Sequence, residues 1–409
     1  MDMTTKYQNT LTYLKDLHFD CFVCITELRF AKKQLYIFIN RFKWVKKIYI
    51  FLWFLIIFLS LSQCKKDEDS GGIPNTPDAS NELTCSQCWN FGNIIEIQGN
   101  TMVISEERSV ILYELKNAGW QLMQTINYDR TSTVQKIILQ PSQLIVGLTE
   151  GFGKVVIYTK QTNGLWLKSQ ELSKKLHQDN FGNAIHINGD IMIIGANAPW
   201  TDEDAPCPLC YKNDDIGRAY IYKFENNIWV YQTELVSSDS SKGDRFGESV
   251  YLVDNFAIVS NRKFNDKGVQ VFENVNENWR FDRYLSVKGG VIAGYNNEVL
   301  INGYVDNGSG IKAYTVSNGT FIDKSVQDNT SVSGFSDHGE EMDVYKEYAL
   351  IASEYPPEKC FLYHLIGNNW VIEQEFNAPE KKEAAFSGLA ISDDYFVMGG
   401  RNFVKIYQR

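Results

Sequence analysis

The strongest constraint on the fold is an aromatic residue that recurs every 42 to 64 residues along the last 320 residues of the chain. Seven short β-type runs end in it, at Tyr113, Tyr158, Tyr222, Phe272, Tyr314, Tyr363 and Tyr407. A second aromatic follows the first six of these by seven or eight residues, at Trp120, Trp166, Trp229, Trp279, Phe321 and Trp370. A period of this length is typical of structural repeats that stack on their neighbours. We therefore expect an array of similar units.

Each repeat has the pattern of four short strands. An apolar run precedes every aromatic, and a further run before it opens with a Phe-Gly pair in Phe91-Gly92, Phe181-Gly182 and Phe246-Gly247, with Phe386-Ser387-Gly388 as an altered copy. Turn residues such as those at 188–190 separate the runs, as in antiparallel sheets. The prediction is an all-β chain, a seven-bladed β-propeller of four-stranded blades whose recurring aromatics fill the wedges between neighbours.

The last repeat stops at Arg409, after its third strand. Its fourth strand has to come from another part of the chain, because an open ring would expose a sheet edge. Residues 81–88, directly before the first repeat, are the expected source. The propeller domain is predicted to span residues 83–409, with both of its ends in one blade.

The region before the repeats has the layout of an export signal. Residues 48–61 are apolar and uncharged and follow four basic residues between positions 41 and 47. Fourteen residues fall short of the ~20 that span a bilayer, which favours a cleaved signal peptide over residues 44–63. Residues 1–43 are then expected to lie upstream of the true start and outside the mature protein. Residues 64–82, rich in Gly, Pro, Ser and acidic residues, are expected to form a flexible linker.

The segment Leu61-Ser62-Gln63-Cys64 resembles the lipobox of bacterial lipoproteins, although Gln63 stands where a small residue is usual. The resemblance implies that Cys64 is lipidated and becomes the first residue of the mature chain. A plain signal peptide or a signal anchor, with Cys64 unmodified, is the alternative.

The Phe-Gly openings and the segments FGNAIHINGDIMIIGAN and GRAYIY resemble FG-GAP repeats. That family forms seven-bladed propellers, as in the integrin α-subunit head and many bacterial surface and secreted proteins. The third and fourth repeats match best, whereas the second, fifth and sixth lack the Phe-Gly pair. The resemblance implies an architecture more than an activity.

Two cysteine pairs have the spacing of either disulfides or metal ligands: Cys85 with Cys88, and Cys207 with Cys210. An exported chain meets an oxidising compartment, so we expect disulfides within or between the pairs. A four-thiolate zinc site and free thiols are the alternatives.

Loop acids raise the question of calcium, which FG-GAP propellers often bind through alternating Asp and Asn oxygens. Neither Asp306, Asn307 and Ser309 nor the acids of residues 196–217 reproduce that pattern, so we expect no cofactor, with calcium as the alternative. Residues 196–217 are our candidate binding loop, an aromatic anchor with a polar rim formed by Trp200, Asp202, Glu203, Asp204, Asp214 and Asp215. An insertion without a role is the equal alternative.

From residue 64 onward the chain holds 46 Asp and Glu against 31 Lys and Arg, a balance that argues against nucleic acid as a partner. Of its four histidines there, only His338 lies in a loop with acidic neighbours, and we expect no enzymatic activity. The predicted function is a monomeric surface lipoprotein, anchored in the outer membrane through lipid, whose propeller binds a protein or polysaccharide. A secreted protein is the alternative location.

The rival function is an enzyme that processes an extracellular polysaccharide or ester in the central depression of the ring. Three or more acids or histidines converging on the ring centre would favour it, whereas an apolar centre would favour binding.

Overall fold

The computed structural model describes residues 82–85, 88, 90–149, 153–174, 180–197, 216–237, 239, 244–261, 268–305, 308–327, 341–353, 359–377 and 386–409. All of them belong to the second of two compact units, Gly71–Arg409. Strands are the only extended regular elements in these ranges. The described residues accordingly contain no helix with the length and hydropathy needed to cross a bilayer.

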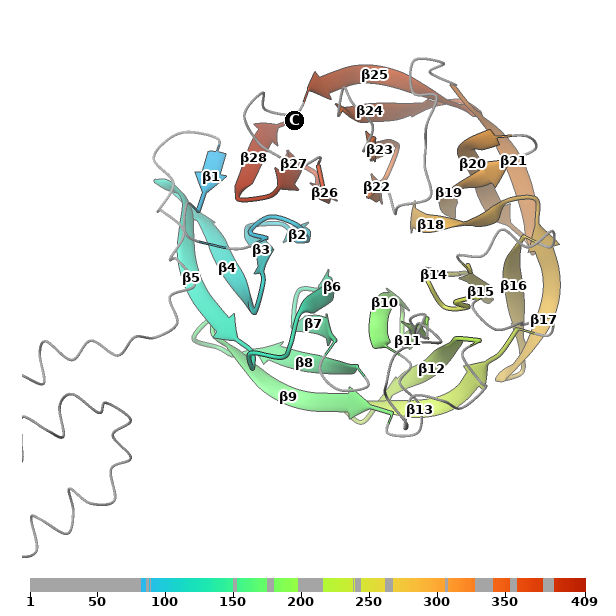
Figure 1. Cartoon of the computed structure of the whole chain (residues 1–409), viewed down its shortest axis with the longest axis horizontal. Helices are drawn as coiled ribbons and strands as arrows, with labels where there is room; N and C mark the ends of the chain where they lie inside the picture. Colours follow the sequence, from blue (N-terminus) through green and yellow to red (C-terminus); the bar gives the residue numbers. More distant parts are fainter. Residues whose placement is uncertain are drawn as a thin grey trace, which may run out of the picture. The chain divides into compact units, whose positions relative to one another are not determined.

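The described strands form seven antiparallel groups of four, which follow one another around a ring (Figure 1). Group one contains β2 (Ile95–Gln98), β3 (Thr101–Glu106), β4 (Ser109–Lys116) and β5 (Gly119–Asn127). Group two contains β6 (Val134–Leu139), β7 (Gln143–Leu148), β8 (Lys154–Lys160) and β9 (Trp166–Ser173). Group three contains β10 (Phe181–Asn188), β11 (Ile191–Ala196), β12 (Arg218–Glu225) and β13 (Ile228–Leu235).

Group four contains β14 (Val250–Val253), β15 (Phe256–Val259), β16 (Val269–Val275) and β17 (Asn278–Leu285). Group five contains β18 (Lys288–Tyr295), β19 (Glu298–Val305), β20 (Gly308–Ser317) and β21 (Thr320–Val326). Group six contains β22 (Met342–Tyr345), β23 (Tyr348–Ser353), β24 (Lys359–Ile366) and β25 (Asn369–Asn377). Group seven contains β26 (Gly388–Ile391), β27 (Tyr395–Gly400), β28 (Phe403–Gln408) and β1 (Glu82–Thr84).

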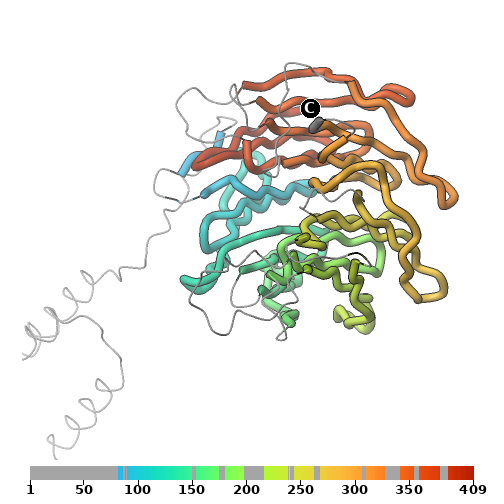
Figure 2. Tube along the Cα trace, turned by 45° about the vertical axis from the view of Figure 1, so that its right-hand side comes forward, coloured from blue at the N-terminus to red at the C-terminus, as the bar shows by residue number. Residues whose placement is uncertain are grey.

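The ring closes through the first strand of the domain. β1 pairs antiparallel with β28, with Leu83 opposite Val404. The blue start of the domain therefore lies beside its red end (Figure 2). The first strands of successive groups also contact one another all the way round, from β2 through β6, β10, β14, β18 and β22 to β26 and back to β2. These contacts confirm the predicted closing strand and the β-propeller arrangement.

The core is divided among the junctions between groups. Each of the seven apolar clusters combines residues from two neighbouring groups. The recurring aromatics lie in these clusters: Tyr222 and Trp229 are each 4% exposed, and only Trp279, Phe321 and Tyr407 of the thirteen are partly buried. Burying one large apolar side chain contributes about 1.5–3 kcal/mol, so the repeated wedges hold neighbouring groups together.

The Phe-Gly pair allows close backbone packing between neighbouring groups. At the junction of groups three and four, Phe246 is fully buried and Gly247 has φ 90°. A Cβ at Gly247 would lie 2.1 Å from the backbone oxygen of Arg218, and one at Gly195 would lie 2.2 Å from the oxygen of Gly247. Only glycine fits two backbones that approach this closely.

Group five differs from groups one, two, three, four and six at its outer strands. A register shift precedes the recurring aromatic in groups one, two, three, four and six, at Tyr113, Tyr158, Tyr222, Phe272 and Tyr363. β20 and β21 pair without such a shift. β21 then pairs parallel with β25, with Ser325 opposite Asn369, and joins groups five and six into one eight-stranded sheet. Bulges increase strand twist, so the regular β21 is better suited to this second pairing.

Candidate functional site

The first cysteine pair forms a disulfide. Cys85 and Cys88 are joined directly after β1, and both are buried in the cluster between groups seven and one. This confirms a disulfide within the first pair, and in this oxidised form neither sulfur is a thiolate that could bind zinc. Cys360 is a free cysteine with no exposed surface.

Most of the other sequence-predicted site residues lie outside the described residues. These are Cys64, Cys207, Cys210, Trp200, Asp202, Glu203, Asp204, Asp214, Asp215, Asp306, Asn307 and His338. Within the described ranges, no three His, Cys, Asp or Glu side chains are grouped so as to hold a metal ion.

One position on the first strand of every group faces its neighbour, and we call it the inner slot. It is the residue paired with the third residue of the second strand, and it is occupied by Glu96, Ile138, His186, Tyr251, Ala293, Asp343 and Ala390. Sequence reasoning did not identify this position, because its occupants share no residue type. Register counting from the recurring aromatics is the signal that would have found it.

Two slot residues make the same contact between groups. His186 accepts a hydrogen bond at Nδ1 from the backbone N–H of Leu252, at 3.0 Å, and Asp343 accepts one at Oδ2 from Ile391, at 2.7 Å. In both cases the donor is the residue directly after the slot residue of the next group: Leu252 follows Tyr251, and Ile391 follows Ala390. The two hydrogen bonds are therefore equivalent in position. Burial lowers the pKa of His186 to about 3, which agrees with the neutral ring that this hydrogen bond requires. Burial raises the pKa of Asp343 to about 6.

Charged slot residues from different groups gather near the middle of the ring. Lys136, in β6, acts electrostatically on Glu96, His186 and Asp343, which belong to groups one, three and six. Burial raises the pKa of Glu96 to about 8 despite the opposing charge of Lys136. Two acids and a histidine from three groups thus lie within electrostatic range of one lysine, although they are not grouped closely enough to hold a metal ion. Two of the three, however, hold the backbone of the next group.

An open groove lies between groups five and six. It has a volume of about 650 Å³, within the range of ~300–1,000 Å³ typical of small-molecule sites. It is lined by Tyr295, Asn296, Asn297, Glu298, Lys346, Glu347 and Leu365. These residues come from β24 and from two equivalent turns, the one between β18 and β19 and the one between β22 and β23. The rings of Tyr295 and Tyr345, which end β18 and β22, lie 4.7 Å apart and join the two turns.

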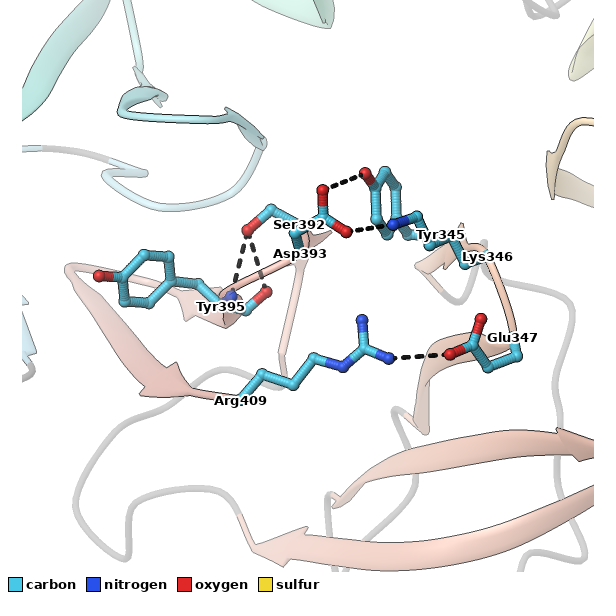
Figure 3. Close-up of polar contacts among 7 residues, drawn as sticks. All are labelled: Tyr345, Lys346, Glu347, Ser392, Asp393, Tyr395 and Arg409. Atoms are coloured by element: carbon cyan, nitrogen blue, oxygen red, sulfur yellow. Dashed lines mark hydrogen bonds and ion pairs between the residues drawn. The ribbon is translucent and has the colours of Figure 1, made fainter.

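Group seven fixes the β22–β23 wall of the groove (Figure 3). Asp393 accepts hydrogen bonds from the Tyr345 hydroxyl, at 3.0 Å, and from the Lys346 ammonium. The hydrogen bond with Lys346 lowers the pKa of Asp393 and raises that of Lys346, so both stay charged near neutral pH. Arg409 pairs with Glu347 at 3.1 Å and lies over the ring of Tyr348 at 3.9 Å.

Glu298 forms part of the opposite wall of the groove. Its Oε1 accepts a hydrogen bond from the Thr315 hydroxyl, at 2.7 Å, and lies 3.7 Å from the ammonium of Lys324. Its Oε2 is buried and has no hydrogen-bond partner among the described residues. Because Oε2 is covered by protein, Glu298 contributes to the wall through its contacts with Thr315 and Lys324.

Comparison with known proteins supports the fold and gives a partial family match. A family model described as FG-GAP repeat matches residues 229–272, from β13 to β16. No curated protein matches the chain significantly.

Three solved structures illustrate the likeness in fold. A chain in the "Crystal Structure of Mitotic Checkpoint Complex" has TM-score 0.51 and 12% identity, covering 78% of this chain and 89% of its own. The Neurospora crassa Pan2 WD40 domain has TM-score 0.48 and 7% identity over 78% and 88%. The β-propeller domain of the Trilobed protease from Pyrococcus furiosus has TM-score 0.46 and 10% identity over 78% and 97%. At this identity the first of these likenesses concerns the fold alone and says nothing of activity.

Proposed function

We propose that the chain is a surface lipoprotein, anchored through Cys64, whose seven-bladed propeller binds a protein or polysaccharide partner and has no catalytic role. The groove between groups five and six is the observation that carries the binding role. Its exposed amides, Asn296 and Asn297, and its partly exposed Tyr295 offer contacts to a partner, and its charged wall is held in place by ion pairs. Aromatic and amide side chains are well suited to such surfaces because they give contact area and hydrogen bonds at low entropic cost.

Retention on the insoluble envelope and extracellular polymers of the producing cells tests the binding role. The full-length protein is compared with a groove variant, Tyr295→Ala with Asn297→Ala, and with a control, Tyr304→Ala with Asn276→Gly, which alters an exposed tyrosine and a turn asparagine outside the groove. We expect the groove variant alone to lose at least about fivefold of its retention. Protease treatment of the polymers would abolish binding to a protein, and periodate would abolish binding to a polysaccharide. Equal retention of both variants would contradict the proposal.

The anchor requires a separate measurement. Mass spectrometry of the mature N-terminus is expected to show an acylated Cys64, and Cys64→Ala is expected to release the protein from the membrane fraction. An unmodified Cys64 would remove the lipoprotein part and leave the binding role to be judged by retention.

The second candidate is an extracellular polysaccharide- or ester-processing enzyme, supported by Glu96, His186 and Asp343, which all lie within electrostatic range of Lys136. New reducing ends or carboxyl groups released from the same polymers would reveal turnover. His186→Gln and Asp343→Asn each keep an acceptor for the next group while removing an acid or base. Turnover that disappears in both folded variants would favour the enzyme, and equal turnover in the wild type and both variants would remove this candidate.

A further inference from the structure

We propose that the groove between groups five and six binds a neutral, hydroxyl-rich ligand, a segment of an uncharged oligosaccharide. This inference rests on the proposed binding function and selects one ligand chemistry for its site.

The charges of the groove exclude a strong preference for an ionic ligand. Its three charged lining residues are Glu298, Lys346 and Glu347, and each has a partner of opposite charge. The partners are Lys324, Asp393 and Arg409, so cations and anions balance. An ionic ligand would have to displace one of these partners, whereas a neutral ligand would leave every pair intact. The acidic balance of the chain from residue 64 onward also disfavours anionic polymers.

The uncharged groups of the groove match a sugar. Tyr295 supplies a partly exposed aromatic ring, which packs against the C–H face of a pyranose, and Leu365 adds apolar surface. Asn296 and Asn297 carry exposed amides, which both donate and accept hydrogen bonds, as vicinal hydroxyls do. A purely apolar ligand would leave these polar groups without partners.

The local backbone holds these groups in position. Asn296 has φ 50°, a conformation that asparagine adopts more readily than most residues, and the equivalent turn residue Lys346 has φ 56°. The Asn296 carbonyl accepts a hydrogen bond from Tyr251 of group four, at 3.4 Å, and the Asn297 carbonyl accepts one from the N–H of Val316, at 2.8 Å. The backbone of the turn is fixed from two sides, which leaves the two amide side chains for the ligand.

The test measures binding of full-length protein to neutral hexasaccharides of glucose, mannose, galactose and xylose by isothermal titration calorimetry. Hexagalacturonate serves as the anionic counterpart of the galactose ligand. Tyr295→Ala removes the ring, and Asn296→Gly removes one amide while keeping a residue that tolerates positive φ. Tyr304→Ala and Asn276→Gly are the matched controls; Asn276 also has positive φ, at 53°.

We expect at least one neutral hexasaccharide to bind, with tenfold or more loss of affinity in Tyr295→Ala and threefold or more in Asn296→Gly. Both controls should stay within twofold of the wild type, and hexagalacturonate should bind at least tenfold more weakly than its neutral counterpart. Binding of no neutral ligand, tighter binding of the anion, or unchanged affinity in Tyr295→Ala would overturn the inference. If envelope retention is then still lost in the groove variant, the binding function stands and only the ligand class is wrong.

Discussion

The junction between groups three and four and the junction between groups five and six are reinforced by different links. The first is tight on the inside, where His186 holds the N–H of Leu252 and Gly195 faces Gly247. The second has Ala293 in the inner slot, a side chain without a hydrogen-bonding group, and is instead joined on the outside by the pairing of β21 with β25.

The groove lies at the junction whose outer strands pair. The first strands pack against one another at both junctions, β10 against β14 and β18 against β22, so the two junctions differ in the links that are added: a polar inner link with a glycine contact at the first, and paired outer strands at the second. The groove of about 650 Å³ lies at the turns of the first strands in groups five and six. In this ring, the candidate groove lies at a junction between repeats that lack the Phe-Gly pair and not at one that carries it.

Gly247→Ala is expected to have the largest effect, because it breaks the tight junction directly. The new Cβ would meet the backbone oxygen of Arg218 at 2.1 Å, and the positive φ of 90° adds strain. We expect a loss of about 3 kcal/mol or more in the free energy of unfolding, measured by urea denaturation. Gly189→Ala is the matched control, since Gly189 also has positive φ, at 61°, but no atom within 4 Å of its Cβ position. It should cost only about 1 kcal/mol.

Equal losses in the two glycine variants would show that backbone conformation alone explains the requirement for glycine. The close approach of groups three and four would then not be the reason for the Phe-Gly pair, and the contrast with the junction of groups five and six would lose its basis.

The inner link of His186 predicts a specific dependence of stability on pH. Its pKa is lowered to about 3 in the folded chain, from an ordinary value near 6.5, so the unfolded chain binds the additional proton between these values. The contribution of neutral His186 to the free energy of unfolding is therefore fully present above about pH 6.5 and is lost as the pH falls toward 3. Each unit of pH in that window is worth about 1.4 kcal/mol per proton, and allowing for relaxation we expect a loss of about 2–3 kcal/mol between pH 7 and 4.

His186→Gln keeps an acceptor for Leu252 and removes the titration, so it should lose about 2–3 kcal/mol less than the wild type over this range. Asp343 acts in the opposite sense: its pKa is raised to about 6, so its contribution makes the folded chain less stable as pH rises from about 4 to 6. This contribution is common to both proteins and cancels in their difference. Parallel stability profiles for wild type and His186→Gln would contradict the inner link.

The features of the fold that depend on repeated residue types were predictable from the sequence. Tyr222 and Trp229 fill the wedge between groups as expected. The last repeat supplies only three strands, so the segment directly before the first repeat was the expected fourth strand, and β1 takes this place. The inner slot was not predictable from residue type, since an acid, a histidine, a tyrosine and alanines all occupy it. The seven residues have in common only their place in the strand pairing, and that place is known only once the strands are paired.

The candidate site was less predictable than the fold. The sequence drew attention to residues 196–217 because of their composition, whereas the groove is built from ordinary turns at 295–298 and 345–348 that only the ring brings together. One further signal was present but unused: a glutamine four residues after the second aromatic recurs at Gln124, Gln170 and Gln374. These glutamines act by contacting the neighbouring group, and the sequence of a single repeat does not show that contact.

Gln124 and Gln170 replace strand pairing at the outer edge of the ring. Gln170, in group two, accepts a hydrogen bond from the backbone N–H of Trp229, in group three, and donates one to its oxygen, both at 2.8 Å. Gln124 makes the same two contacts with Trp166. Between groups five and six the backbone itself makes the outer link, and Gln327 adds one contact to the N–H of Ile372, at 3.0 Å.

Gln170→Ala should therefore cost more than Gln327→Ala, although both effects are smaller than those above. Losing two hydrogen bonds to a partly buried backbone is expected to lower the free energy of unfolding by about 1–2 kcal/mol, and losing the single exposed bond of Gln327 by about 0.5 kcal/mol. Gln232→Ala, which removes an exposed amide bonded only within its own strand, is the control and should be close to neutral. If Gln327→Ala cost as much as Gln170→Ala, the parallel pairing of β21 with β25 would contribute little. The two junctions would then be held in the same way, by side-chain amides, and the contrast between them would be lost.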